Sequence, residues 1–156
     1  MYPLLLTLHS WLRWIVVIVG VIAVARFALG WGGRRAWQGL DGRLAVVLPT
    51  LLDIQLLVGL LLYFFASPIT AGALRNFGAA MGNAVTRFFA VEHLLLMVIA
   101  LALAHVGGVL VKQRRADPAR FRLATVLFGL AIVVILAAIP WPFVTAGMNR
   151  PWFRLG

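Results

Sequence analysis

Long apolar runs separated by short polar stretches dominate the pattern of this chain. Four of the runs are long enough for a helix that crosses a bilayer, which needs about 20 mostly apolar residues. We expect these helices to span approximately residues 3–29, 44–66, 87–111 and 123–139. The predicted fold class is therefore all-α, an integral membrane bundle in which residues 1–156 form a single transmembrane domain.

The polar connections between the runs predict the topology. The basic residues of the first and third connections are Arg34, Arg35, Arg43, Lys112, Arg114, Arg115, Arg120 and Arg122. The second connection and the C-terminal tail hold only Arg75, Arg150 and Arg154. Because cytoplasmic loops carry an excess of Lys and Arg, we expect both termini on the outer side. Short connections favour an antiparallel, up-down four-helix bundle.

Composition supports the same class and limits the partners. The chain is 63% hydrophobic and 12% charged, with a mean hydropathy of +1.02, which excludes a soluble globular domain. It has no Cys, so disulfides and thiolate chemistry are excluded. The net charge of +10 gathers at the ends of the spans, which predicts contact with the lipid bilayer rather than with nucleic acid.

Three of the runs carry ionisable residues, which cost about 2.5–3.5 kcal/mol each at the centre of a span and so indicate function; two of these runs carry histidines. His9 lies six residues beyond Pro3, and His93 lies six residues beyond Arg87. At 1.5 Å per residue, both histidines lie about 9 Å from the outer face. Neutral imidazoles on two helices at one depth are the axial ligands that a haem iron requires. A hydrogen bond across the bundle interface is the alternative role for such a pair.

Helical faces add a weaker indication. His93 shares a face with Met97, Ala100, Ala104 and Gly107, and small residues there would leave space for a flat macrocycle. Small residues also allow close helix packing. Met97 is an alternative axial ligand or a core residue. His105 has no histidine at its depth on another span, so we expect it to cap the inner helix end or bond to a loop.

The remaining polar residues of the spans predict a network. Arg13 and Gln55 lie at similar depth and Asp53 lies a turn deeper, which predicts an Arg13–Asp53 pair with Gln55 nearby. Glu92 is expected to bond to a ring nitrogen of His9. The network either fixes helix register or serves quinone or proton chemistry.

Two basic residues and one other metal site complete the candidates. Arg75 and Arg87 lie near the outer face, where they would meet haem propionates, although Arg87 also suits an interfacial anchor. A mixed copper, zinc or iron site at His9, Glu92 and His93 is the alternative to a haem.

Four segments, LHSWLRW, DIQLLVGLLLYF, RFFAVEHLLLMVIALALAH and IPWPF, resemble those of small bacterial four-span proteins of the cytochrome b-like type. The resemblance implies haem b held by His9 and His93, electron exchange with quinone or with donors at the outer surface, and a place in the bacterial inner membrane with periplasmic termini. The second and fourth spans lack the histidines of the di-haem pattern.

The function expected from these residues is electron transfer by one bis-His haem near the outer face, with Arg13 and Arg87 as further cofactor-binding residues. Whether the protein is also an enzyme, a small haem-dependent oxidoreductase, stays open. One alternative is a cofactor-free accessory subunit of a larger respiratory or photosynthetic membrane complex. Another is an oligomeric transporter of a metal or small solute. The expected protein partners are the subunits of such a complex or further copies of this chain.

Overall fold

The computed structural model describes residues 1–33, 35–147 and 150–154, and within these residues it contains helices, turns and coil but no β-strand. Four helical segments are long and apolar enough to cross a membrane: Tyr2–Gly32, Gly39–Ala66, Ala84–Gln113 and Asp117–Ala138. The protein is therefore a multi-pass, all-helical membrane bundle by length and composition.

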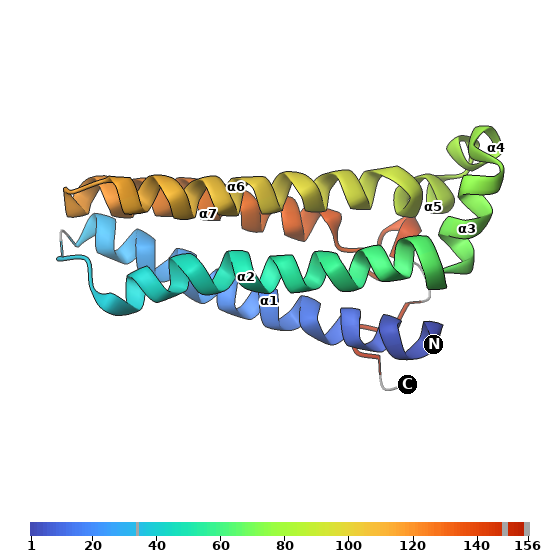
Figure 1. The fold of residues 1–156 in the computed structure, drawn as a ribbon, viewed down its shortest axis with the longest axis horizontal. Helices are drawn as coiled ribbons and strands as arrows, with labels where there is room; N and C mark the ends of the chain where they lie inside the picture. The colour runs from blue at the N-terminus through green and yellow to red at the C-terminus, as the bar shows by residue number, and fades with distance from the viewer. Residues whose placement is uncertain (34, 148–149, 155–156) are drawn as a thin grey trace.

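Figure 1 shows the long helices side by side, with the start of α1, the C-terminal tail and the short helices α3, α4 and α5 gathered at one end of the bundle. The elements in chain order are α1 (Tyr2–Gly32), α2 (Gly39–Leu61), η1 (Leu62–Ala66), α3 (Pro68–Arg75), α4 (Phe77–Gly82), α5 (Ala84–Arg87), η2 (Phe88–Glu92), α6 (His93–Gln113), α7 (Asp117–Ala138) and η3 (Thr145–Gly147). Both η1 and η2 are single π-helical turns, and η3 is a 3₁₀ turn.

The four long helices form a closed ring of contacts. The most extensive packing joins α6 to α7, followed by α1 with α7, α1 with α2, and α2 with α6. Aromatic side chains fill the end of the bundle near residues 35–38: Phe27, Phe121 and Phe128 are fully buried and Trp37 is partly buried. Phe27 packs on Phe128, and Trp37 packs on both Phe27 and Phe121. Gly30 has no side chain where the ring of Phe121 lies, so α1 and α7 approach closely there.

Two helices begin earlier than their apolar runs predict. Helix α2 begins at Gly39 because Gln38 and Asp41 form a reciprocal capping box, which satisfies backbone N–H groups of the first turn. Helix α7 begins at Asp117, ahead of the predicted residue 123, because Pro118 suits the first turn. Polar residues that looked like connections are thus the first turns of helices.

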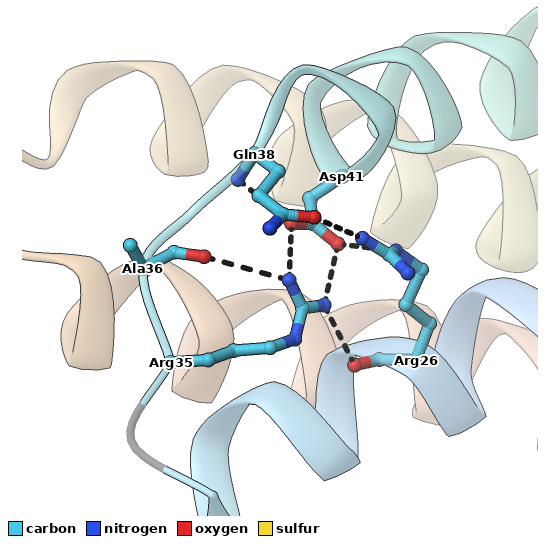
Figure 2. A network of polar contacts seen from close by, with 5 residues as sticks. All are labelled: Arg26, Arg35, Ala36, Gln38 and Asp41. Carbon is cyan, nitrogen blue, oxygen red and sulfur yellow. Dashed lines mark hydrogen bonds and ion pairs between the residues drawn. The ribbon is translucent and has the colours of Figure 1, made fainter.

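A polar network holds the connection between α1 and α2 (Figure 2). The fully buried carboxylate of Asp41 accepts hydrogen bonds from Arg26 Nε at 2.7 Å and from two Arg35 nitrogens at 2.8 and 2.9 Å. Arg26 also donates to the Gln38 side chain at 2.9 Å. The hydrogen bonds to Asp41 raise the pKa of Arg35 above its ordinary value. The network fixes the angle at which the chain enters α2.

Candidate functional site: a histidine-lined cavity at the end that holds both termini

A cavity of about 160 Å³ lies between the four long helices, towards the end of the bundle that holds the N- and C-termini. Its walls come from α1, from α2 with η1, from the start of α3, from η2 with α6, from the last turn of α7 and from the C-terminal tail. Most of the exposed lining surface is apolar, and the polar side chains are Tyr2, His9, Ser10, Arg13, Gln55, Tyr63, Ser67, Thr70, His93, Arg150 and Arg154. A mainly apolar cavity with convergent polar groups has the character of a small-molecule site, and its volume is below the roughly 300–1,000 Å³ of most such pockets.

His9 of α1 and His93 of α6 meet inside this cavity. Their ring centroids are 6.2 Å apart, and their ring planes are inclined by 69°. The residues are 84 positions apart in the sequence, so it is the folding of α1 against the start of α6 that brings them together. The structure therefore places both predicted ligands in one layer of the bundle.

The hydrogen bond of His93 determines which of its nitrogens is free. Its Nδ1 lies 2.8 Å from the carbonyl oxygen of Ala138, at the end of α7. A carbonyl oxygen only accepts hydrogen bonds, so Nδ1 carries the proton and donates it. In the neutral ring, Nε2 then keeps its lone pair, as in histidines whose second nitrogen is oriented by a carbonyl while the first binds a metal.

His9 is held through its backbone and by a glycine. Gln55 Nε2 donates to the His9 carbonyl oxygen at 3.0 Å, which ties α2 to α1. A Cβ atom on Gly59 would lie 3.1 Å from His9 Cε1, so the imidazole packs against the bare backbone of α2. This contact sets the position of the His9 ring.

Three buried polar atoms of the cavity have no hydrogen-bond partner among the described residues: His9 Nδ1, Arg13 Nε and Gln55 Oε1. Buried polar atoms are nearly always paired, and each exception requires an explanation. Three such atoms around one cavity indicate that a polar or metal-bearing group belongs there.

The C-terminal tail covers the cavity from the outside. Arg13 and Trp14 both donate to the carbonyl oxygen of Trp152, at 2.9 and 3.0 Å, and Trp11 donates to that of Arg154 at 2.8 Å. The guanidinium of Arg150 lies 4.4 Å from the centre of the Phe89 ring. Burial lowers the pKa of Arg150, yet a guanidinium stays cationic in proteins. Arg150 and Arg154 were not among the predicted site residues, although the alternation of Arg with aromatic residues in RPWFR is a signal for such a strap.

The predicted Arg13–Asp53 pair does not form. Arg13 reaches the tail, whereas Asp53 Oδ1 bonds to Nε2 of His105 at 2.9 Å. Asp53 and Gln55 are two residues apart and so point about 200° from each other around α2. Gln55 is buried against α1, which turns Asp53 away from it. The expectation that His105 caps a helix end or bonds to a loop is wrong, because its Nε2 bonds to Asp53 of α2.

Glu92 also has a different partner from the one predicted. It accepts a hydrogen bond from Arg87 Nε at 2.6 Å rather than bonding to His9. The π turn η2 places residues five apart on one face, which aligns these two side chains. Arg87 therefore does not line the cavity, and no group of three potential metal-binding His, Cys, Asp or Glu residues exists in the part of the chain that the structure describes. The geometry does not support the mixed copper, zinc or iron site at His9, Glu92 and His93.

The small residues below His93 serve helix packing instead of leaving space for a macrocycle. Ala100 and Ala104 are fully buried, and Gly107 lies against Leu127 and Phe128 of α7. Met97 lines the cavity and packs against the core, so both of its predicted roles stay open.

No protein-family model, no curated protein and no solved structure matches this chain. The resemblance to cytochrome b-like proteins therefore stays a prediction, and a functional conclusion depends on the geometry of the cavity.

Proposed function

We propose that this protein is a b-type cytochrome-like electron-transfer protein of the membrane, with one haem held between His9 and His93 near the outer face. The observation that carries the proposal is the pair of imidazoles in one cavity, with centroids 6.2 Å apart. His9 and His93 are the residues that would hold the haem iron, because imidazoles are common protein ligands of haem iron and these two lie in one cavity.

Other residues of the cavity suit the same group. The Nδ1–H of His93 is held by the Ala138 carbonyl, which orients the ring for ligation through Nε2. Arg13 and Arg150 place positive charge at the cavity, where carboxylates such as haem propionates would pair with them. A bound haem would supply one-electron chemistry, and the tail over α1 would limit the access of water.

The arrangement in the bilayer follows from the same proposal. In Figure 1, α1 and α6 run away from the end that holds the termini, and α2 and α7 run back towards it, which supports an up-down bundle. The connections at residues 35–38 and 114–116, which carry Arg35, Arg114 and Arg115, lie at the opposite end. By the positive-inside rule, the cavity then faces the periplasmic side of a bacterial inner membrane, where a quinone within the bilayer is the proposed electron partner.

The test is the absorption spectrum of the purified, reduced protein after haem reconstitution in detergent. We expect the low-spin spectrum of bis-His haem from the unmodified chain and its loss in His9→Ala and in His93→Ala. His105→Ala is the matched control, because His105 bonds outside the cavity to Asp53, and it should keep the spectrum. Failure of the unmodified chain to bind haem, or an unchanged spectrum in both cavity variants, would disprove the proposal.

One observation favours a second candidate, a cofactor-free accessory subunit of a larger respiratory or photosynthetic complex. Asp53 and His105 lie in the second and third spans, and each is half exposed on the lipid-facing side of the bundle. Because ionisable side chains are costly in contact with lipid, this exposure suits a chain that packs against another membrane protein. Stable co-purification with a large complex, without visible absorbance from this chain, would support this role in place of the haem.

A further inference from the structure

The Asp53–His105 pair lies at a depth where an outward-facing polar pair is unfavourable. Asp53 is about 20 Å from either end of the segment Gly39–Ala66, near the middle of its span. Both side chains are 50% exposed, and the only hydrogen bond of either among the described residues is the 2.9 Å contact between them. Ionisable residues in membrane spans usually face the bundle interior, so this pair indicates a second protein surface on this face.

The surroundings of the pair have the spacing of a helix-packing seam. On α2, four exposed residues follow one another at intervals of four, three and four: Val46, Thr50, Asp53 and Leu57. On α6, the same intervals separate four further exposed residues: Val98, Ala102, His105 and Val109. Intervals of this kind form the apolar stripe by which helices pack in left-handed pairs, and small residues such as Ala102 permit close approach.

We infer that this face, defined by these eight residues of α2 and α6, is the interface of a two-fold symmetric homodimer in the membrane. A two-fold axis along the membrane normal keeps every residue at its own depth and sets α2 of one copy against α6 of the other. Asp53 of each copy then faces His105 of the second copy. This inference does not depend on the proposed haem.

Charge complementarity is the reason for choosing a second copy as the occupant. Within one copy, Asp53 Oδ1 and His105 Nε2 are used, which leaves Asp53 Oδ2 and His105 Nδ1. An imidazole has two ring nitrogens and a carboxylate has two oxygens, so each pair keeps one unused polar atom on either residue. Two copies related by the axis place the unused polar atoms of Asp53 in one beside those of His105 in the other, whereas lipid chains offer no polar group.

The absence of Cys from the sequence permits a direct test by cross-linking. Full-length Leu57→Cys and Ala102→Cys chains, carrying tags of different size, are mixed in lipid vesicles and oxidised. We expect a mixed disulfide dimer, because residues 57 and 102 of opposite copies lie at one depth on the seam. Ile18→Cys on α1 and Val133→Cys on α7, at equally exposed positions outside the seam, are the controls and should stay uncoupled.

The polar pair is tested by dimer dissociation, measured by energy transfer between labelled full-length chains across a series of lipid dilutions. Asp53→Asn is expected to raise the dissociation constant about tenfold, as the loss of an interhelical polar contact does. The exchanged double variant Asp53→His with His105→Asp is expected to restore association. Circular dichroism measures the helicity of each variant and so shows whether it is folded. If Asp53→Asn does not fold, the cross-linking experiment still tests the dimer, because its chains retain Asp53 and His105.

Three results would overturn the inference. The first is a chain that stays monomeric at every lipid ratio. A chain that associates only with a different membrane protein, and not with itself, counts as the same result. The second is coupling at Ile18→Cys or Val133→Cys as strong as at the seam. The third is a folded Asp53→Asn variant with unchanged association.

Discussion

The state of His93 depends on two prolines that are distant from it in the sequence. In a helix, the carbonyl of residue i accepts from the N–H of residue i+4, and proline has no N–H to donate. Pro140 and Pro142 therefore free the carbonyls of Leu136 and Ala138. The Trp141 indole donates to the first at 2.8 Å, and His93 Nδ1 donates to the second at 2.8 Å. The motif IPWPF thus ends α7 and also provides the acceptor that orients a cavity histidine.

Gly59 determines the position of the other histidine, which leads to a prediction. Gly59→Val introduces a branched side chain whose Cβ would lie 3.1 Å from His9 Cε1, so the imidazole must move. We expect loss of the low-spin haem spectrum with helicity retained. Gly72→Val is the control, since a Cβ there meets no atom within 4 Å. An unchanged spectrum in Gly59→Val would show that the His9 ring does not occupy this position.

Asp41 is the residue on which the other end of the bundle depends. Asp41→Asn removes the negative charge between Arg26 and Arg35 while keeping the side-chain size. The substitution leaves Arg26 and Arg35 without their carboxylate partner, which is destabilising. We therefore expect Tm in detergent to fall by on the order of 5 °C. Asp117→Asn is the control, as its contact with Arg120 is a longer 3.6 Å pair near the surface. Equal Tm values for the two variants would contradict a structural role for the buried network.

At the scale of the element, the two π turns lie within the second and third spans, near the connection that α3 and α4 form between them. A regular α-helix bonds all interior carbonyls, whereas a π turn shifts the pattern and leaves acceptors to other groups. Ala90 lies in η2, and its carbonyl accepts from the Tyr63 hydroxyl of η1 at 2.7 Å. The Tyr63 carbonyl in turn accepts from Thr70 of α3 at 2.7 Å. These bonds hold the α3–α5 segment against the end of the bundle beside His93.

Tyr63→Phe removes the hydroxyl and leaves the Ala90 carbonyl without this partner. A buried acceptor that loses its donor costs about 1–3 kcal/mol, so we expect a lower Tm and faster amide hydrogen exchange in residues 84–94. The matched control is Tyr2→Phe, whose hydroxyl makes no hydrogen bond in the described part of the chain. If exchange in residues 84–94 is the same in both variants, the Tyr63 hydroxyl does not hold η2.

The elements also show why some features were predictable and others were not. Four apolar runs predicted the four long helices, because length and hydropathy are properties of each segment alone. Counting residues from the span ends placed His9 and His93 in one layer, since rise per residue is nearly constant. The partners of Arg13, Asp53 and Glu92 depend also on the rotation of each helix about its axis. The depth of a residue in the membrane does not determine that rotation. The π turn before His93 also has no local sequence pattern that identifies it.

At the scale of the whole molecule, the two ends of the bundle are built differently. One end is filled by aromatic rings and closed by the Asp41 network, with the basic connections beside it. The other end holds the cavity, the tail and the short helices. A closely packed end and an end with a cavity suit the proposed haem site, which would then open to one side of the membrane. Under that proposal, the orientation in the bilayer determines from which side an electron donor must come.

This orientation is open to a direct measurement with single cysteines. Gly78→Cys lies in α4 at the cavity end, and Gly39→Cys lies at the start of α2 at the basic end; a side chain meets no atom within 4 Å at either position. Because the basic end is expected in the cytoplasm, a membrane-impermeant maleimide should label Gly78→Cys in spheroplasts. It should label Gly39→Cys only after the membrane is permeabilised. The reverse pattern would place the cavity in contact with the cytoplasm, and the electron donor would then have to be sought there.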